Sequence, residues 1–428
     1  MHRTKQGPDG PVTPERASVP PTTAESTSVM RPVAAGERIE VIDILRGFTI
    51  FGILLVNMPL YSWPNWGPLR AMRAQLPGGP ADQVAGWIIW LFAEDKFYPL
   101  LSFLFGLGFS IQLARAEWRD AHFVPVYRRR LLALLLIGLG HGFLIWSGDI
   151  LARYAIVGFL LVPFRSCRKK TIVAFAIVCL LIPIALLPIQ REVHEQLFGF
   201  VVGRHADYKA LWEESLRAYS HGRFAEIMAE RVRAIAWTFS WPIGWLQILG
   251  LFLTGLYAGR REFFQKLPTY LPFIRKAMWW ALGLGLAGIL ARAGIFKLPD
   301  LRVPYFPRFA EGVLETAGYL ALSFFYASVI ILLAQRQAWK TRLAPLAAVG
   351  RMALSNYLFQ SLVCTTIFYG YGLGLFGKVG PAAGLGLTFA IYAMQIPLSL
   401  WWLRRFRFGP MEWVWRSLTY GKLQPMRR

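Results

Sequence analysis

Runs of apolar residues constrain this chain more than any other feature of its sequence. They recur along its length and reach roughly the 17–25 residues that a helix needs to cross a hydrocarbon core of about 30 Å. Of the 428 residues, 55% are hydrophobic and 17% are charged, whereas a soluble domain has roughly 45–50% and about 25%. Backbone in lipid must satisfy its own hydrogen bonds, and the alternating pattern of barrel strands is missing. The sequence therefore predicts an all-α, polytopic membrane bundle.

The apolar runs predict about ten transmembrane helices. We expect them near residues 41–62, 97–114, 130–147, 150–165, 171–190, 238–258, 277–297, 314–335, 346–371 and 383–404. Segment 84–96, which contains Trp87 and Trp90, is predicted either to lie in the outer interface or to extend the second helix.

Three segments follow from this division of the chain. Residues 1–38 are rich in Pro, Thr, Ser and charge, which predicts a disordered cytoplasmic tail and not a signal peptide. Residues 39–407 form the predicted bundle. Residues 408–428 predict a cytoplasmic interfacial segment, because Trp413 and Trp415 suit the headgroup region.

Basic residues orient the predicted bundle. The net charge of +23 is concentrated in loops 115–130, 165–170, 260–276 and 336–342 and in the tail after residue 404. With ten transmembrane helices, these four loops and the tail all lie on one side of the membrane, and the positive-inside rule makes that side cytoplasmic. We therefore expect a multi-pass protein of the inner (plasma) membrane with both termini in the cytoplasm, and no binding of nucleic acid.

The longest outer segment, 191–237, mixes acidic and basic residues with apolar ones at helical spacing. This pattern predicts one or two amphipathic helices lying over the bundle. They would act either as a lid without chemistry or as a cap that binds an acceptor.

Ionisable groups within apolar runs are functional candidates, because they are costly in lipid. His141 lies between Gly138, Gly140 and Gly142, which would let another backbone or a ligand come close. Its imidazole could act as a general base or bond to a neighbouring helix. Arg130 lies eleven residues earlier, roughly 16 Å along a helix, where it could bind a phosphate or simply anchor the helix at the surface.

Other polar residues fall into local groups. Asp149 and Arg153, at i and i+4, predict either a structural ion pair or a polar acceptor site. Asp43 and Arg46 predict a similar pair, at i and i+3, near the cytoplasmic surface.

Three further sets of polar residues fall in or beside the apolar runs. Glu94, Asp95 and Lys96 predict a water-filled cavity or a helix break. Arg351, Met352, Asn356 and Gln360 predict a polar stripe along one helix, and Asn57, Asn356 and Gln360 could bond between helices.

The usual motifs of metal and nucleotide sites are missing. Cys167, Cys179 and Cys364 are scattered, so neither zinc nor a disulfide framework is expected. The sequence contains no Walker loop, dinucleotide fingerprint or GxSxG elbow. We therefore predict no metal site.

Five ordered segments resemble the YeiB-like bacterial membrane family, whose C-terminal half is defined as domain of unknown function 418. They are RIEVIDILRGFTIFGILLVN (38–57), KFYPLLSFLFGLG (96–108), GLGHGFLIWSGDILARYA (138–155), GRMALSNYLFQS (350–361) and FGPMEWVWRSLTY (408–420). The likeness covers nearly the whole chain after residue 36.

That family is similar to a wider group of transmembrane acyltransferases, including the heparan-type glucosamine acetyltransferases. The shared feature is DILRG (43–47) with Asn57 eleven residues after Arg46. The resemblance implies transfer of an acyl group from cytoplasmic acyl-CoA to an acceptor on the far side. The heparan-like branch takes its histidine from the outer loop after the first helix, whereas loop 61–84 here contains none, so His141 would take that role.

The first functional hypothesis is a membrane-embedded acyltransferase that uses acyl-CoA and an envelope sugar or lipid. Its predicted catalytic residues are His141, Asp149 and Asn57, with Asn356 as an alternative oxyanion donor. Its predicted donor-binding residues are Arg46, Arg130 and Arg351, and its predicted substrate-binding residues are Arg153, Asn356, Gln360 and Glu94. The second hypothesis is a transporter or flippase for an anionic or amphiphilic solute, and the third is a membrane scaffold.

Overall fold

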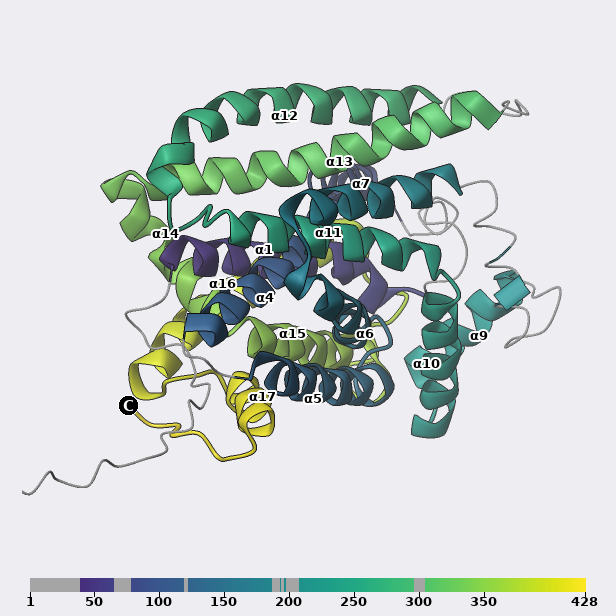
Figure 1. Ribbon diagram of the computed structural model, residues 1–428. Coiled ribbons are helices and arrows are strands. Elements are labelled where there is room, and N and C mark those ends of the chain that lie inside the picture. Colours follow the sequence, from purple (N-terminus) through teal and green to yellow (C-terminus); the bar gives the residue numbers. More distant parts are fainter. Residues whose placement is uncertain are drawn as a thin grey trace, which may run out of the picture.

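The computed structural model describes residues 39–64, 78–118, 122–186, 193, 196–197, 208–295 and 305–428. The predicted tail, residues 1–38, lies outside the described residues. Within them the regular structure is helical apart from an isolated antiparallel bridge between Phe406 and Arg427. The predicted all-α bundle is therefore confirmed. Most of the helices lie side by side, with α9 and α10 at one end and α14 and the C-terminus toward the other (Figure 1).

The helices of the first half are α1 (Glu40–Ser62), α3 (Pro80–Phe92), α4 (Tyr98–Trp118), α5 (Phe123–Leu144), α6 (Leu151–Leu161), the 3-10 helix η2 (Val162–Ser166) and α7 (Lys169–Ala185). Those of the second half are α9 (Tyr208–His221), α10 (Phe224–Phe239), α11 (Ile243–Arg260), α12 (Leu267–Ile295), α13 (Tyr305–Ala334), α14 (Gln337–Arg351), α15 (Ala353–Phe368), α16 (Pro381–Arg405) and α17 (Pro410–Tyr420).

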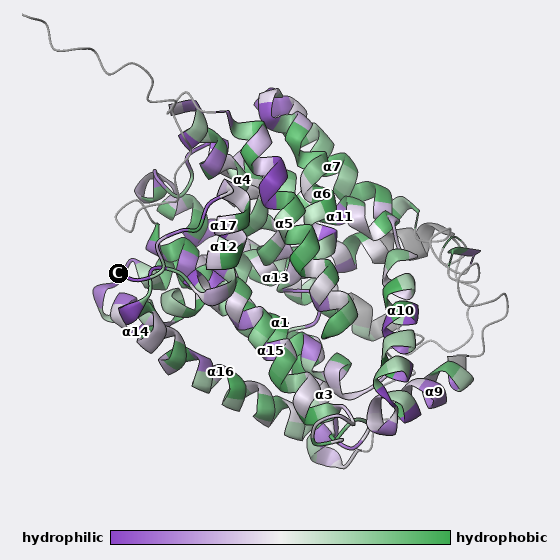
Figure 2. Cartoon of the chain, turned by 90° about the horizontal axis from the view of Figure 1, so that it is seen from below, coloured by the Kyte–Doolittle hydropathy of each residue, from purple (hydrophilic) through white to green (hydrophobic). Residues whose placement is uncertain are grey.

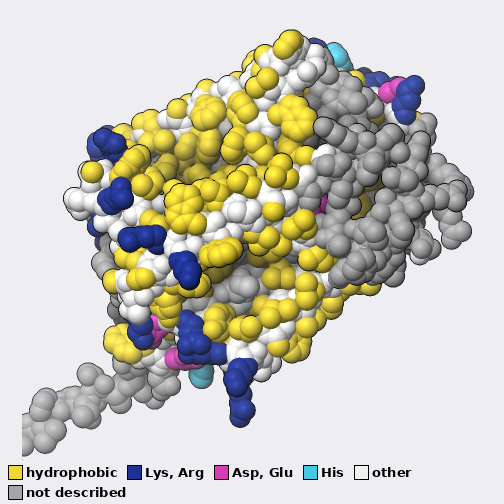
Figure 3. Space-filling view, turned by 90° about the horizontal axis from the view of Figure 1, so that it is seen from above, with side chains coloured by type: hydrophobic (Ala, Val, Ile, Leu, Met, Phe, Trp, Pro, Cys, Tyr) yellow, Lys and Arg dark blue, Asp and Glu magenta, His cyan; other side chains and the backbone are white. Residues whose placement is uncertain are grey.

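Five helices in the described part of the chain are long and apolar enough to cross a membrane: α1, α4, α16, and windows of α12 and α13. Helices α10 and α11 pass the same test as a pair bent by 68°. Hydrophobic residues cover the face formed by α12 and α13, with Lys and Arg at one edge (Figure 3). Hydrophilic residues instead concentrate toward α14 at one end and α9 and α10 at the other (Figure 2). These are features of a membrane protein, while the total of about ten spans stays a prediction.

Glycines bring the central helices into backbone contact. A Cβ on Gly350 of α14 would lie 1.9 Å from the carbonyl oxygen of Asp43, and one on Gly47 of α1 would lie 2.0 Å from that of Leu346. A second close crossing joins α4 to α11, where a Cβ on Gly106 would meet the Phe252 carbonyl oxygen. Small residues permit such approach between helices where larger ones would hold them apart. Helix α1 thereby becomes the buried centre of the bundle, with α4, α14 and α15 around it.

The predicted ninth span, 346–371, is wrong as one helix. Helix α14 ends at Arg351, Met352 leaves the helical conformation (φ −112°, ψ 31°), and α15 begins at Ala353. The predicted polar stripe from Arg351 to Asn356 is therefore divided between two helices. The carboxylate of Glu412 accepts hydrogen bonds from backbone N–H groups at the start of α15, which lowers the free-energy cost of the break.

Segment 84–96 does not extend the second helix, since α3 is a helix of its own. Its place in the outer interface stays a prediction. Turn 93–97 separates α3 from α4, so the helix break predicted at Glu94, Asp95 and Lys96 is confirmed. Lys96 Nζ donates to the carbonyl oxygens of Trp90 (2.9 Å) and Glu94 (2.7 Å). These bonds satisfy a buried ammonium group at the break.

Helices α9 and α10 confirm the prediction of amphipathic helices within 191–237, for the part of that segment that is described. They form a cap at one end of the bundle. Gly370 N donates to Tyr219 O (2.8 Å), and Arg231 Nη1 donates to the carbonyl oxygens of Phe143 and Leu144. The cap thus contacts the end of α5 and the start of the loop after α15.

Candidate functional site

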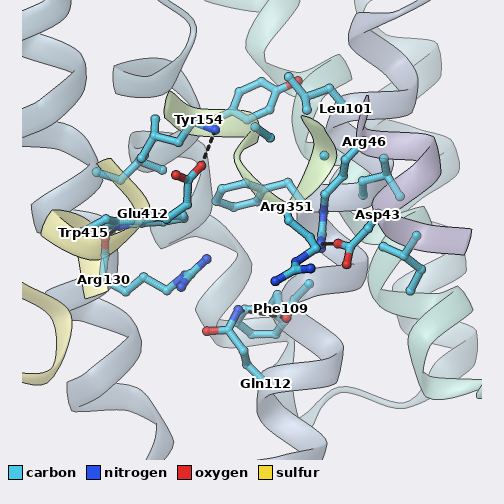
Figure 4. Close-up of a pocket in the computed structure, with 18 of the residues that line it drawn as sticks. Asp43, Arg46, Leu101, Phe109, Gln112, Arg130, Tyr154, Arg351, Glu412 and Trp415 are labelled. Atoms are coloured by element: carbon cyan, nitrogen blue, oxygen red, sulfur yellow. Dashed lines mark hydrogen bonds and ion pairs between the residues drawn. The ribbon is translucent and has the colours of Figure 1, made fainter. Parts of the chain in front are cut away.

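A cavity of about 310 Å³ lies among α1, α4, α5, α6, α15 and α17, beside the break between α14 and α15. Its lining changes in character along its length. Arginines and one glutamine line the part near α17 and the start of α1, and aliphatic and aromatic side chains line the part between α4, α5 and α6. Figure 4 shows Arg130 reaching into this space from one side, with Arg46 and Arg351 on the other.

Five arginines line the cavity: Arg46, Arg115, Arg130, Arg351 and Arg416. The three predicted donor-binding arginines are among them, although they come from α1, α5 and α14. Asp43 and Glu412 are the acidic residues of the lining among the residues described. The cavity therefore carries an excess of positive charge, which favours an anionic ligand such as a phosphate.

Local contacts orient two of these arginines, Arg46 and Arg130. Arg46 Nη1 donates to Asp43 Oδ1 at 2.8 Å, so the predicted pair at i and i+3 is confirmed. The guanidinium of Arg130 lies over the indole ring of Trp415, 3.7 Å from its centroid, and Trp415 Nε1 donates to Arg130 O at 2.8 Å. A cation–π contact of this kind orients a guanidinium and leaves its edge N–H groups available to a ligand.

Glu412 has a structural task at the cavity wall. Its Oε1 accepts from the backbone N–H groups of Leu354 (2.7 Å) and Ser355 (3.1 Å), and its Oε2 accepts from Ser355 Oγ (2.5 Å). A carboxylate at a helix N-terminus satisfies otherwise unpaired donors and complements the helix dipole. Glu412 therefore caps the start of α15, and the lining still holds five arginines against two carboxylates.

Aromatic side chains close the inner end of the cavity. Tyr154 and Tyr357 line it together with Leu134, Ile150 and Leu151. The hydroxyl groups of Tyr154 and Ser102 bond to each other at 2.6 Å. An apolar end of this kind suits an uncharged chain or group attached to the anionic part of a ligand.

His141 lies just beyond this inner end. Its Nδ1–H donates to Asp149 Oδ2 at 2.8 Å, and both side chains are almost fully buried, with 1% and 5% of their surface exposed. The other oxygen of Asp149 accepts from Ala152 N (2.7 Å) at the start of α6. This arrangement leaves the Nε2 lone pair of a neutral imidazole free to accept a proton. Nε2 is buried and has no hydrogen-bond partner among the described residues.

The local sequence explains how His141 meets Asp149. A Cβ on Gly138 would lie 2.4 Å from Ala152 N and 2.9 Å from Asp149 Oδ1, so only glycine lets the start of α6 approach α5 here. A Cβ on Gly142 would be in ordinary contact with Asp149 Cβ at 3.6 Å. The close approach predicted for the glycines around His141 is confirmed at Gly138, whereas Gly140 faces open space.

Tyr357 connects the cavity to His141. It lines the cavity, and its ring centroid is 5.1 Å from that of His141. His141 itself is not part of the lining. The ring of Trp146 lies on another side of His141, with centroids 6.3 Å apart. The histidine is therefore enclosed by aromatic rings, and one of them also forms the cavity wall.

The remaining predicted residues lie outside the cavity lining. Asp149 forms no ion pair with Arg153 among the described residues, because its oxygens are used by His141 and α6. Arg153 is close enough to Asp149 and Tyr357 for its charge to act on both. Asn57 lies farther along α1, and Glu94 lies buried in turn 93–97.

Asn356 and Gln360 join α15 to α16. Asn356 Nδ2 donates to Val349 O (3.2 Å) and Ser399 Oγ (3.0 Å), and Gln360 Nε2 donates to Gln395 Oε1 (2.8 Å). Gln395 Nε2 in turn donates to Asn356 O (2.9 Å). Both amide N–H groups of Asn356 are thus used within the bundle, which does not favour its predicted role as an oxyanion donor.

Sequence reasoning missed six of the site residues discussed above: Arg115, Tyr154, Tyr357, Glu412, Trp415 and Arg416. Trp415 was expected only to anchor an interfacial helix, and Glu412 lies in the same segment. Tyr357 follows Asn356 directly, so the polar segment 351–360 was the signal that could have led to it. Nothing in the spacing of Tyr154 or Glu412 indicates which cavity they line.

Fold and site together define a helical membrane protein with an arginine-lined cavity that ends beside a buried His–Asp pair. Residues 258–422 match the family model described as "Protein of unknown function (DUF418)". The chain is 35% identical to the uncharacterized protein YxaH of Bacillus subtilis (strain 168) over 413 residues, which cover 93% of this chain and 98% of YxaH. It is 28% identical to the uncharacterized protein YeiB of Escherichia coli (strain K12), with 91% and 98% covered. The chain therefore belongs to the YeiB-like DUF418 family.

Proposed function

We propose that this protein is a membrane-embedded acyltransferase that takes an acyl group from acyl-CoA and passes it to an envelope sugar or lipid. One observation carries the proposal: a single cavity has arginines at one end and an apolar inner end that stops at Tyr357, against which the His141–Asp149 pair packs. The arginines suit the phosphates of CoA, and the apolar part suits its pantetheine arm and acyl group.

The reaction follows from the placement of His141. Nε2 removes the proton of an acceptor hydroxyl while the acceptor oxygen attacks the thioester carbonyl carbon. The tetrahedral adduct then breaks its C–S bond, and the imidazolium returns the proton to the departing CoA sulfur. The products are an ester and CoA thiol, with His141 neutral again. Asp149 holds the Nδ1 proton and stabilises the imidazolium in between, which is the general role of a carboxylate behind a histidine base.

Burial of the reacting groups supports transfer over hydrolysis. His141 is 2% exposed and is enclosed by the rings of Tyr357 and Trp146. A site that excludes water protects a thioester from wasteful hydrolysis. For the oxyanion we keep Asn57 as a proposal from the sequence alone, since this residue of α1 is not part of the cavity lining.

The proposed orientation places the arginine end of the cavity in the cytoplasm of a bacterial cell, with both termini on that side of the inner membrane. Three basic loops gather at the end where α1 begins. Lys340 pairs with Glu40 at 3.4 Å, and Arg260 donates to backbone oxygens of the 165–167 turn. The positive-inside rule then favours this end as cytoplasmic. The cap of α9 and α10 would face the periplasm.

Sidedness tests the proposal, because CoA thioesters are polyanions that do not cross bilayers unaided. We expect an acyl-CoA with a photoreactive acyl chain to label the protein in inside-out membrane vesicles and not in right-side-out ones. The label should map to the 101–109 part of α4 and be displaced by acetyl-CoA. Detergent-opened vesicles of both kinds serve as controls and should label equally. Labelling only from the right-side-out face, or label that acetyl-CoA does not displace, would refute the proposal.

A further inference from the structure

Arg231, the arginine of the cap that contacts α5, is fully buried but only partly hydrogen-bonded. Arg231 of α10 is 0% exposed, and its Nη1 donates to Leu144 O at 2.9 Å and Phe143 O at 3.3 Å. Its Nε and Nη2 are buried without any hydrogen-bond partner in the described part of the chain. The ring of Tyr369 lies 5.7 Å from its guanidinium carbon.

The contact with α5 accounts for only part of Arg231. Helix α5 ends at Leu144, and a cation beside its last carbonyl groups satisfies them and complements the negative end of the helix dipole. That task uses Nη1 alone. Nε and Nη2 lie on the same edge of a guanidinium, where their N–H bonds run parallel, and this edge is the fork that binds a carboxylate or a phosphate through two oxygens. The unused atoms are therefore the two that would hold an acidic group.

Acidic residues of the cap do not fill this fork. Glu214 binds Arg233 through both of its oxygens, at 2.6 and 2.7 Å, which holds the pKa of Glu214 below its ordinary value. Glu230 accepts from Ser215 Oγ (2.5 Å) and pairs with Arg233 (2.6 Å). Arg231 has no carboxylate within ion-pair distance among the described residues. A buried charge without a counter-ion is costly, so this position favours an anion from outside the chain.

Arg231 lies close to His141, so an anion bound by Arg231 would lie near the proposed catalytic base. Phe143 and Leu144, which it contacts, follow His141 by two and three residues, so the guanidinium lies about one helical turn beyond the histidine. This end of α5 is opposite the arginine end of the cavity, where Arg130 lies. A molecule held by Arg231 would therefore approach His141 from the cap side, and not through the donor cavity.

We infer that Arg231 binds the acidic group of the acyl acceptor, so that the acceptor is an anionic molecule bearing a carboxylate or a phosphate. The identification of this anion as the acyl acceptor rests on the proposed acyltransferase function, whereas the anion site itself does not. The ring of Tyr369 lies over a face of the guanidinium. An acidic sugar and a glycerol phosphate headgroup both carry the required chemistry.

The test is an anion titration of purified full-length protein that is first saturated with CoA, so that the donor arginines are occupied. Thermal unfolding is followed as glucuronate or glycerol 3-phosphate is added, with glucose and glycerol as neutral counterparts. We expect one of the two anions, and neither neutral molecule, to raise Tm in a saturable way. The anion that acts identifies the source of the acidic group.

Arg231→Lys is the decisive variant, because lysine keeps the charge near the α5 carbonyl groups but has no two-pronged edge. It should weaken anion binding about 10-fold or more. Arg217→Lys, the same change at an exposed arginine of α9, should leave binding unchanged. Equal binding by Arg231→Lys, or no response of the wild type to either anion, overturns the inference.

Amide hydrogen exchange of the wild-type protein, measured with and without the anion, provides a second test that does not depend on whether Arg231→Lys folds. Anion binding should slow amide exchange in α10 and in the 369–379 loop, and unchanged exchange there overturns the inference as well. If the proposed function is wrong, the result is different. CoA binding will then be absent or independent of Arg130, while the anion response will still depend on Arg231.

Discussion

Replacement of His141 by asparagine is expected to lower acyl transfer by about 10²–10⁴-fold, which is the usual contribution of a positioned general base. The amide N–H group of asparagine can take the place of Nδ1–H and keep the bond to Asp149, but asparagine has no basic nitrogen. The fold should therefore survive the loss of the base. The assay is transfer of radioactive acetyl from acetyl-CoA to membrane material, in membranes with matched amounts of protein.

Two further variants make this result specific. Asp149→Asn should also lower transfer by at least about 10²-fold, because an amide cannot hold the correct tautomer or stabilise the imidazolium. His221→Asn, at an exposed histidine of α9, should have no effect. Full transfer by a folded His141→Asn protein contradicts the catalytic role. Loss of folded protein in both His141→Asn and Asp149→Asn would instead make the pair structural.

Replacement of Gly350 by alanine should have the largest effect on stability. Its Cβ would lie 1.9 Å from Asp43 O and 2.7 Å from Gly47 N. Both atoms belong to the backbone of α1, so the helices must separate. We expect a loss of at least about 3 kcal/mol, at the upper end of the usual cost of overpacking. Size-exclusion profiles and thermal unfolding in detergent measure the effect.

Gly386→Ala is the matched control, since a Cβ on this exposed glycine of α16 would meet nothing within 4 Å. Alanine is the better helix former by about 1 kcal/mol, so this variant should be as stable as the wild type or slightly more so. Equal stability of the Gly350 and Gly386 variants would mean that α1 and α14 are not in backbone contact. That contact also places Arg46 and Arg351 at one cavity, so the Gly350 variant should bind ligand poorly even where it folds.

The features that were predictable from the sequence are those that depend on composition or on close spacing. The length of the apolar runs gave the helical membrane bundle, and the spacing of Asp43 and Arg46 gave their ion pair. The glycines near His141 indicated a close helix approach, and Gly138 provides it. The positions of Arg46, Arg130 and Arg351 at one cavity agree with the predicted donor role, which only ligand binding can test.

Features that depend on distant parts of the chain were not predictable. The break at Met352 interrupts an otherwise apolar helical pattern, and the side chain that caps the new helix start is Glu412, more than fifty residues later. His141 and Asp149 meet across a turn, so their separation of eight residues carries no helical period. Arg153 has the spacing of an ion-pair partner for Asp149, but His141 and the α6 backbone take both oxygens. Tyr357 joins cavity and histidine because its ring on α15 reaches that of His141 on α5, a contact between positions more than two hundred residues apart.

The central claim is that the arginine-lined cavity binds an acyl-CoA, and a binding titration of the purified protein measures it most directly. Acetyl-CoA should bind with a micromolar dissociation constant, more weakly as salt rises, and more weakly when its 3′-phosphate is removed. Arg130→Ala should weaken binding at least about 10-fold, the cost of a lost charge-assisted contact, whereas Arg407→Ala on the exposed surface should not. Tight, phosphate-dependent binding that needs Arg130 is the result we predict. Folded protein that binds no acyl-CoA, or that binds it equally without Arg130, would contradict the account and turn attention to the transport of anionic solutes.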